Sequence, residues 1–589
     1  MEPLTVKLET IYSQAIEKSF PQLAGTRATI RPSIHADYQC NSAMALIKKV
    51  KELNIEGKLD PKSLAEKLAA NVPDNDLIAT QTVDKGFINI SLQDGYVGKK
   101  VLSILKDGIV IVPEKKQKVI IDYSAPNIAK EMHVGHLRST IIGDSIANIL
   151  EFLGHEVHRI NHIGDWGTAF GMLLAYMEEK FPDYVESPPA IGDLQKFYQE
   201  AKKRFDEDPD FNKKSKDCVV KLQSKEPAIY RAWELICEIS RKEFQQIYDV
   251  LDIHGLIERG ESFYQDKMSD MVEDLKKREL IVQDDGRWMF FINGKTKEVP
   301  LTVIKSDGGF TYDTSDVACL RYRVATEKAD RIIYVTDAGQ ESHFRSIFAA
   351  AQQAGYYDPE KVLVQHVVFG LVLGEKGTKF KTRSGDSVRL KELLDEGIVR
   401  AEQKLKEKER DKILSPEELE VAKKAIAYGC IKYSDLAQDR IKNYEFSFDR
   451  MLDDRGNTAV YLLYCLARIR SIIRKTGITK SAKELADETK ELVLTHPREL
   501  RLAKFILKFP DIIMTVSETL SPHTLCTFLF ELSVVFSEFY EQCYVIEKIP
   551  GGDSEQFKVN MERVLLCEAT SYILSLGLKL LGIKLVEKL

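Results

Sequence analysis

The spacing of hydrophobic residues changes twice along the chain and divides it into three parts. Helical spacing and then a strand-like alternation occur before residue 115, at 4–18, 43–53, 61–70 and 86–92. Short apolar runs then alternate with helical patterns, and from about residue 387 apolar positions recur at i, i+3 and i+4. We therefore expect a small α+β N-terminal domain, a central α/β domain and an all-α C-terminal bundle.

The central part has the pattern of a parallel sheet with crossover helices. Its strand-like runs and the helical patterns between them lie at 118–123, 137–153, 156–161, 331–336, 341–354 and 362–368. Gly154, directly after the first helical pattern, is typical of a helix C-terminus. Because parallel neighbours need a long connection, this alternation predicts a parallel sheet. Long charged helical patterns interrupt it at 171–300, and we interpret that block as a helical insertion.

The C-terminal part has helical spacing over five segments, at 416–439, 455–476, 496–508, 522–545 and 556–582. Proline and clustered charge at 112–118 indicate a linker between the first two parts. The domains that we predict are an N-terminal domain, a central domain, connecting stem helices and a helical bundle, at 1–115, 116–400, 401–445 and 446–589.

Composition and charge narrow the class of protein. The 589 residues are 44% hydrophobic and 30% charged, which is ordinary for soluble globular domains, and no apolar run is long enough to span a membrane. The start lacks a basic region followed by an apolar stretch, so no secretory signal is expected. Nine scattered cysteines without a Cys-x-x-Cys pair indicate reduced thiols in the cytoplasm. At a net charge of −6, a nucleic acid must bind to local basic patches.

The most informative motif is His133-Val134-Gly135-His136, between a strand-like run and a helix-like run. Glycine lets an adenine ring approach the backbone, and a helix N-terminus with two imidazoles suits the phosphates of ATP. A zinc site is not favoured, because no cysteine or third histidine has ligand spacing.

The stretch 123–140 resembles the HIGH region of class I aminoacyl-tRNA synthetases, in the form Pro-Asn-x-x-Lys-x-x-His-x-Gly-His-x-Arg-Ser that arginyl-tRNA synthetases have. Further matches to that family follow in order at 164–167, 308–316, 337–344, 380–385 and 455–464. The residues in these segments are most similar to the eukaryotic cytoplasmic form of the family. The resemblance implies a Rossmann-like catalytic domain that ligates L-arginine to tRNA(Arg) through an arginyl-adenylate. It also implies ATP with Mg²⁺ as a substrate, and no permanently bound cofactor.

A guanidinium offers five donors in a fixed fork, so an arginine site needs planar acceptors and a carboxylate. Tyr312 and Asp316 are four residues apart, so on a helix they face the same way. The resemblance implies that they hold the arginine side chain. The other residues for which it implies arginine binding are Ala125, Pro126, Asn127, His136, Glu261 and Gln340. Taken alone, Tyr312 and Asp316 also fit a surface pair on a helix, Gln340 a helix cap, and His343 a core histidine.

The resemblance also implies residues that bind ATP and stabilise its charge. The ATP-binding set is His133, Gly135, His136 and Gly370. Class I enzymes usually carry Lys-Met-Ser-Lys on a loop, but here Thr382 occupies the position of the second lysine. The cations that could replace it are Lys130, Lys379, Lys381 and Arg383, which we count with His133 and His136 as catalytic candidates. For the three loop residues, a solvated basic hairpin is the alternative.

A set of aromatic and basic residues on one predicted helix suits RNA. Aromatic faces stack splayed bases, and arginines bind phosphates or base edges. The resemblance makes the bundle an anticodon-binding domain with tRNA contacts at Asn457, Tyr461, Tyr464, Arg468 and Ser471. It implies that Phe87 and Asn89 contact the tRNA elbow. The tyrosine stripe and Phe87 also fit plain core positions.

We therefore expect a cytoplasmic arginyl-tRNA synthetase whose partners are tRNA(Arg), L-arginine and ATP, with no membrane partner. Three alternatives stay open: a synthetase for another amino acid, a non-catalytic scaffold that kept the fold, and a small-molecule nucleotidyltransferase. Recruitment into a multi-synthetase complex is also open.

Overall fold

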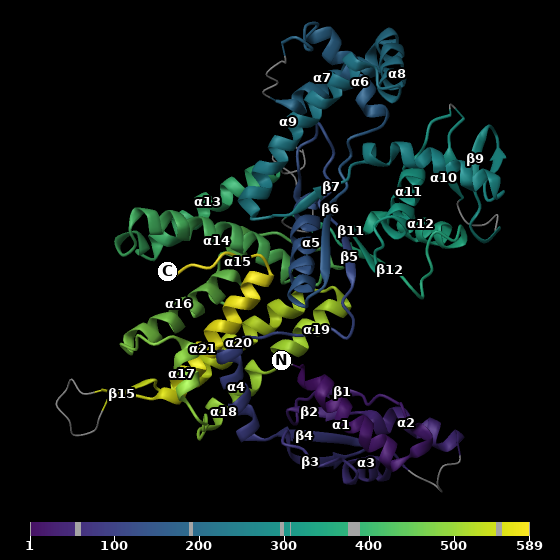
Figure 1. Ribbon diagram of the computed structural model, residues 1–589. Helices are drawn as coiled ribbons and strands as arrows, with labels where there is room; N and C mark the ends of the chain where they lie inside the picture. Colours follow the sequence, from purple (N-terminus) through teal and green to yellow (C-terminus); the bar gives the residue numbers. More distant parts are fainter. Residues whose placement is uncertain are drawn as a thin grey trace.

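Five parallel strands form the central sheet, in the order β12-β11-β5-β6-β7 (Figure 1). Their bounds are Lys118–Asp122 (β5), Glu156–Asn161 (β6), Leu256–Glu258 (β7), Arg331–Asp337 (β11) and Leu363–Phe369 (β12). The crossover helices are α5 (Val134–Phe152) between β5 and β6, and α12 (Glu341–Gln353) between β11 and β12. The predicted Rossmann-like α/β fold is confirmed. The computed structural model describes residues 2–53, 60–187, 193–294, 300–306, 308–374, 389–548 and 557–587.

The strands are buried on both faces, so their apolar residues run continuously instead of alternating with polar ones. Ile121 and Ile333 belong to a core shared with α5 and the C-terminal helices. Ile120 and Ile332 point to the opposite face and pack in a second core with α10 (Gln265–Lys277), α11 (Tyr312–Ala325) and α12. The α5 side and the α10–α12 side of the sheet are therefore two separate packing layers.

The block 171–300 is only partly helical. The predicted long helices correspond to α6 (Thr168–Lys180), α7 (Leu194–Glu207), α8 (Pro209–Gln223) and α9 (Pro227–Leu251). The chain then returns to the central sheet as β7, before α10 and an antiparallel sheet of β8 (Val282–Asp284), β9 (Arg287–Phe290) and β10 (Leu301–Ile304). These strands have three or four residues each, which is too short for a periodic pattern.

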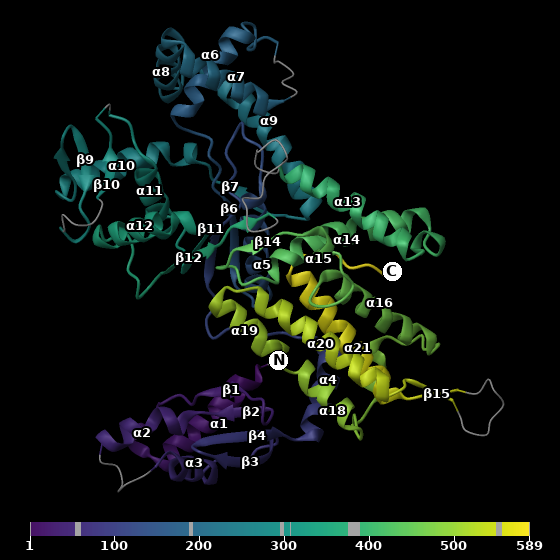
Figure 2. The ribbon, with the colours of Figure 1, turned by 180° about the vertical axis from the view of Figure 1, so that it is seen from behind.

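The N-terminal domain packs helices on an antiparallel sheet of order β1-β2-β4-β3. The helices on this sheet are α1 (Leu4–Ser19), α2 (Ser42–Glu52) and α3 (Pro61–Ala70), whereas α4 (Asp94–Asp107) leaves the sheet and packs against helices of the C-terminal part of the chain. The strands are β1 (Ile30–Pro32), β2 (Tyr38–Cys40), β3 (Ile78–Asp84) and β4 (Phe87–Leu92). Both views put this domain and the α6–α8 helices at opposite ends of the molecule (Figures 1 and 2).

Two stem helices, α13 (Leu390–Glu407) and α14 (Pro416–Leu436), lead from the sheet to the C-terminal bundle. The bundle contains α15 (Phe448–Met451), α16 (Ala459–Lys475), α17 (Ala482–Glu488), α18 (Pro497–Ile506), α19 (Phe509–Thr519), α20 (His523–Gln542) and α21 (Met561–Leu580). Two small strand pairs are β13 (Val372–Leu373) with β14 (Tyr444–Glu445), and β15 (Ile546–Lys548) with β16 (Phe557–Val559). In the part of the chain that the structure describes, no helix has the length and apolarity that crossing a membrane requires.

Candidate active site

The strand order reverses between β5 and β11. From β5 the chain builds the sheet outward through β6 and β7, and it then returns to the other side of β5 as β11. In open α/β sheets, ligands bind outside the carboxyl ends of the strands at such a reversal. The loop of residues 123–133 follows β5 here, and a short helical turn, Ala338–Gln340, follows β11.

The loop after β5 holds three non-glycine residues at positive φ: 76° at Ser124, 45° at Ala125 and 60° at Ala129. Such backbone is costly unless its surroundings hold it. The Ala125 amide donates to Asn161 Oδ1 at 3.0 Å, and the Ala129 amide donates to Ser240 Oγ at 3.0 Å. Strands and helices on either side therefore fix the loop that carries Ala125, Pro126 and Asn127.

Asn127 lies against the Gly164-Asp165-Trp166-Gly167 segment. The Ile128 amide donates to the Gly164 carbonyl at 3.0 Å, and the Gly164 amide donates to the Pro126 carbonyl at 3.0 Å. A Cβ on Gly164 would be only 2.2 Å from Asn127 Oδ1. Glycine at 164 is therefore required for the exposed Asn127 side chain to keep this position.

The two histidines cap the first turn of α5 in a reciprocal way. The Gly135 amide donates to His133 Nδ1 at 3.0 Å, and the His133 amide donates to His136 Nδ1 at 3.1 Å. Because a neutral imidazole carries one proton, both rings must hold it on Nε2. The rings lie side by side, with centroids 4.0 Å apart. A Cβ on Gly135 would be 2.9 Å from His133 Cε1. The His133 ring therefore occupies the space that a side chain at position 135 would need.

Both imidazoles are neutral at physiological pH. Burial is the main cause that lowers the pKa of His136 to about 3, and repulsion from Lys130 and from His133 in its protonated form acts in the same direction. Burial is also the main cause of the lowered pKa of His133, which Asp337 opposes and Lys130 reinforces. The paired rings therefore offer two neutral N–H donors rather than two cations.

Carboxylates gather on the other side of the reversal. Asp165 is buried and accepts from the Ser262 amide at 2.8 Å and from Ser262 Oγ at 2.6 Å. Burial, with the negative charges of Asp165 and Asp316 in second place, raises the pKa of Glu261 to about 8. These groups thus form an electronegative cluster that a cation would stabilise.

Tyr312 and Asp316 lie on the first turns of α11, and Tyr312 is 71% exposed. Asp316 Oδ2 is 2.6 Å from His343 Nε2, and Asp313 Oδ1 is 3.3 Å from His343 Nδ1. Hydrogen bonds to Asp313 and Asp316 raise the pKa of His343 to about 10, against the effect of burial. The alternative that Asp316 is only part of an exposed pair with Tyr312 is therefore wrong, because its carboxylate binds His343 on a second helix, α12.

Gln340 is exposed at the N-cap position of α12, but its side chain makes no capping hydrogen bond. Its Nε2 donates to Asp337 Oδ2 at 3.2 Å, so the amide lies at the carboxyl end of β11. Gly370 directly follows β12, and its amide donates to the Arg440 carbonyl at 2.8 Å while its carbonyl accepts from Arg138 Nη1 at 2.6 Å. Gly370 is buried, and a Cβ there would lie 2.6 Å from the carbonyl oxygen of Lys442, so this glycine packs against protein on every side that the structure specifies.

The cation candidates differ in position. Lys130 is exposed, its charge acts on both histidines, and its Nζ is 5.4 Å from the centre of the Tyr198 ring on α7. Lys379, Lys381 and Arg383 lie outside the described residues. Among the residues that the structure does describe, no cluster of three or more His, Cys, Asp or Glu side chains could hold a metal ion.

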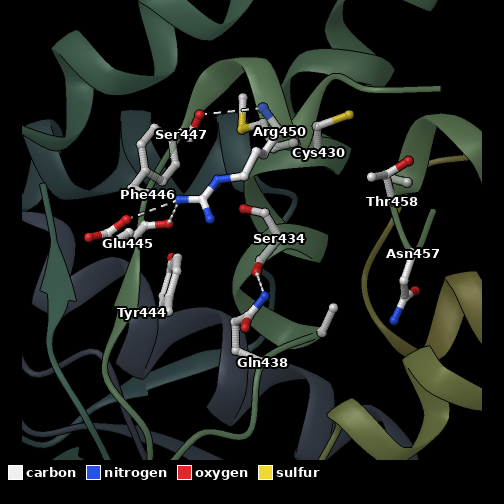
Figure 3. A pocket seen from close by; sticks show the side chains of 13 residues that line it. Cys430, Ser434, Gln438, Tyr444, Glu445, Phe446, Ser447, Arg450, Asn457 and Thr458 are labelled. Carbon is white, nitrogen blue, oxygen red and sulfur yellow. Dashed lines mark hydrogen bonds and ion pairs between the residues drawn. The ribbon is translucent and has the colours of Figure 1, made fainter. Parts of the chain in front are cut away.

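Most of the RNA candidates line two hollows beside α16. Asn457 lines the first, between α14, β14, α15 and the start of α16, where Tyr433 donates to its Oδ1 at 2.6 Å. Figure 3 shows Asn457 and Thr458 on one side of this hollow, and Tyr444, Glu445 and Phe446 on the other. The second hollow is lined by residues that include Lys408, Arg410, Tyr461, Tyr464 and Arg468. Ser471 is half-buried on the same helix.

On β4 the core residues are Ile88, Ile90 and Leu92, whereas Phe87 and Asn89 are half-exposed on the opposite face. Asn89 Oδ1 accepts from Gln39 Nε2 at 2.9 Å on the neighbouring strand. The alternative that Phe87 is a core residue is therefore wrong.

Sequence reasoning missed Asp165, Lys408, Arg410 and the contact of His343 with Asp316. These residues are distant in sequence from their partners, and no local pattern connects them.

Three family descriptions match the chain in order. "Arginyl tRNA synthetase N terminal domain" matches residues 7–92, "tRNA synthetases class I (R), catalytic domain" matches 100–448, and "DALR anticodon binding domain" matches 462–589. With the parallel sheet and the helix that two histidines cap, they define a class I aminoacyl-tRNA synthetase.

Curated relatives and a solved structure agree on the family. The cytoplasmic arginine--tRNA ligase of Xenopus tropicalis is 50% identical over 592 residues, which cover 100% of this chain and 89% of the relative. That of Homo sapiens is 50% identical over 588 residues, which cover 99% and 88%. The Plasmodium falciparum arginyl-tRNA synthetase structure is 35% identical, with a TM-score of 0.86 and 100% of each chain covered. This chain belongs to the arginyl-tRNA synthetase family.

The Thermus thermophilus arginyl-tRNA synthetase structure is 21% identical, with a TM-score of 0.74 and 100% of each chain covered. At that identity the likeness supports the fold alone.

Proposed function

We propose that this enzyme ligates L-arginine to tRNA(Arg) in the cytoplasm, through an arginyl-adenylate, with release of AMP and pyrophosphate. The proposal rests mainly on two groups of side chains with different chemistry, which lie where the strand order reverses between β5 and β11. Two neutral Nε2–H donors lie at the start of α5, and a carboxylate cluster with Asp316 lies across from them. The names of the curated relatives, cytoplasmic arginine--tRNA ligase, support the same activity and compartment.

The carboxylate cluster suits the guanidinium. A planar cation with five donors is stabilised by acceptors that converge from several sides. Asp316 and Glu261 supply carboxylates and Tyr312 a phenol. We infer that Asn127 and Gln340, both exposed, bind the amino and carboxyl groups of arginine. Lysine, a compact point charge, cannot satisfy such a set in the same geometry.

The first step needs no protein nucleophile, because the carboxylate of arginine attacks the α-phosphate of ATP in line and pyrophosphate leaves. The protein positions the reactants and stabilises charge. His133 and His136 donate from Nε2 to phosphate oxygens at the N-terminus of α5, where the helix dipole also favours anions. We infer that Lys130, whose charge is already felt by both histidines, contributes the positive charge that Thr382 cannot.

ATP enters as its Mg²⁺ complex in this account. Mg²⁺ keeps several waters and binds mainly through substrate phosphates and one or two carboxylates. The described residues contain no preformed metal cluster, and Asp337 is the carboxylate whose charge reaches His133. Asp337 therefore fits a place beside nucleotide-bound Mg²⁺.

In the second step, a terminal ribose hydroxyl of the tRNA attacks the carbonyl of the adenylate and AMP leaves. We infer that the two hollows beside α16 bind the anticodon arm through Asn457, Tyr461, Tyr464 and Arg468, with Lys408 and Arg410 adding positive charge. Phe87 and Asn89, on the open face of β4, are proposed to contact the tRNA elbow. Association with a larger synthetase complex and the absence of a membrane partner stay predictions.

Amino-acid-dependent ATP–pyrophosphate exchange with tRNA(Arg) present tests the proposal. We expect exchange with arginine and none with lysine or glutamine, and Asp316→Asn is expected to lose it. Exchange with another amino acid but not with arginine would identify a different synthetase. A chain that binds tRNA but exchanges with no amino acid would be a scaffold.

A further inference from the structure

His343 joins the two helices that carry the predicted arginine-binding residues. It is the third residue of α12, directly after Gln340-Glu341-Ser342, and it contacts α11 at Asp313 and Asp316. Because Asp313 and Asp316 are three residues apart, they lie next to each other on one face of α11. One imidazole ring therefore bridges two carboxylates, through Nδ1 at 3.3 Å and through Nε2 at 2.6 Å.

The position of the ring is not that of a core residue. The side chain of His343 is 27% exposed, and those of Asp313 and Asp316 are 25% and 23% exposed. The apolar packing between α11 and α12 is supplied by other side chains, among them Phe344. The histidine instead lies at the rim of the site, between the helix that carries Tyr312 and the turn that carries Gln340.

We propose that His343 is a positioning residue for arginine: its Nε2–H holds Asp316 Oδ2 and thereby turns Asp316 Oδ1 toward the guanidinium. The proposal rests on the proposed function. The terminal torsion of an aspartate is broad, so an unheld carboxylate samples many orientations. A charge-assisted hydrogen bond removes that freedom, and the second carboxylate oxygen stays available as an acceptor.

The contact with Asp313 has a supporting role. It fixes the rotation of the imidazole, and with it the direction of Nε2–H. His343 is a cation at neutral pH, so it also offsets part of the negative charge of Asp313 and Asp316, which it contacts.

Two amide substitutions separate the two contacts. In His343→Gln the amide nitrogen can reach the place of Nε2 and keep the bond to Asp316. In His343→Asn it can reach only the place of Nδ1 and keep the contact with Asp313. Neither variant carries charge, and they differ by one methylene group. Gln352→Ala, on an exposed position at the far end of α12, is the matched control.

The measurement is aminoacylation of tRNA(Arg) by the full-length enzyme, with KM determined separately for arginine, ATP and tRNA, and with thermal midpoints compared. We expect His343→Asn and His343→Ala to raise the KM for arginine about 10- to 100-fold, as for loss of a hydrogen bond to a charged group. The KM for ATP should change little, and His343→Gln should restore most of the arginine KM.

Equal KM values for arginine in His343→Asn and His343→Gln would overturn the proposal, because only one of them keeps the bond to Asp316. A parallel rise in all three KM values with a lower thermal midpoint would overturn it too, in favour of a purely structural role. Failure of the unsubstituted enzyme to charge arginine would refute the proposed function instead, so the two failures are distinguishable.

Discussion

His133 and His136 use the same atom, Nδ1, to hold the backbone at the start of α5, and each is left with its Nε2–H pointing away from that bond. The sequence motif predicts two imidazoles at a strand-to-helix turn, but not their protonation. Which nitrogen carries the proton follows only from the backbone donors that each ring accepts.

Replacing His136 by alanine should slow arginyl-adenylate formation about 100- to 1,000-fold, because one preorganised donor to the transition-state charge is lost. His254→Ala is the control, since His254 is exposed and pairs only locally with Asp252. The check is single-turnover adenylate formation with tRNA present. An unchanged rate in His136→Ala would contradict the role that we assign to the ring.

The raised pKa of Glu261 leads us to expect that arginine binding depends on pH. Its carboxyl is largely protonated below its raised pKa of about 8, and the ionised form accepts more strongly from a guanidinium, through both oxygens. The KM for arginine should therefore fall as pH rises toward about 8, at most about tenfold per pH unit, and then level off. Glu261→Gln should have a high KM without this slope. A flat profile in the unsubstituted enzyme would contradict the prediction.

At the scale of elements, a buried joint connects the histidine-capped helix to the stem. Arg138 on α5 is 1% exposed and makes an ion pair with Asp435 on α14 at 2.9 Å. Tyr444 on β14 donates to Asp435 at 2.8 Å, and Arg138 donates to the carbonyl of Gly370 after β12. Three segments far apart in the sequence are therefore fixed to α5 at one place.

Asp435→Asn should destabilise the protein strongly, because it leaves the Arg138 guanidinium buried without its countercharge. The expected cost is about 3–5 kcal/mol, the range for breaking a buried pair. Lys202→Ala, at an exposed pair with Asp206 on α7, should cost less than about 1 kcal/mol. Thermal unfolding midpoints compare the two variants, and a similar small drop in both would contradict the structural role of the joint.

Long helices were predictable from the sequence because an apolar stripe repeats over many turns, as in α1, α14 and α20. The short strands β8 and β9 were not, because three or four residues carry no resolvable period. The partners of Arg138 were not predictable either. Its motif marks the residue, but Asp435 is 297 positions away in sequence, and only the packing of α14 on α5 brings them together.

At the scale of the whole molecule, one hydrophobic core runs from the N-terminal domain through the α5 side of the sheet to the bundle. The buried ammonium of Lys432 on α14 donates to the carbonyls of Leu251 at 2.5 Å and Gly582 at 2.6 Å, and so ties the central domain to the end of the chain. Removing the bundle would expose this core, so single substitutions test RNA binding more cleanly than deletions.

Arg468→Ala should raise the KM for tRNA and lower the steepness of its salt dependence by about one counterion, as expected for one lost phosphate contact. The control is Lys475→Ala, an exposed residue at the far end of α16. Aminoacylation measured over a range of salt concentrations gives both quantities. Equal salt slopes for the two variants would argue against a phosphate contact at Arg468.

The order of the domains was predictable, because the motifs follow one another as in the family, and the motifs also supply the site residues that we propose. Their spatial relation was not. The pairing of Asp316 with His343 and the meeting of Asp165, Glu261 and Asp316 depend on segments joined only by the sheet reversal between β5 and β11. The polar contacts of this site are therefore a property of the assembled fold.

The central claim is that Asp316 receives the arginine side chain. A crystal structure of the full chain with L-arginine measures this directly. We predict the guanidinium at about 3 Å from Asp316 Oδ1, with Glu261 and Tyr312 also in contact and His343 still bound to Oδ2. A guanidinium bound elsewhere, with Asp316 facing solvent or protein alone, would contradict the account.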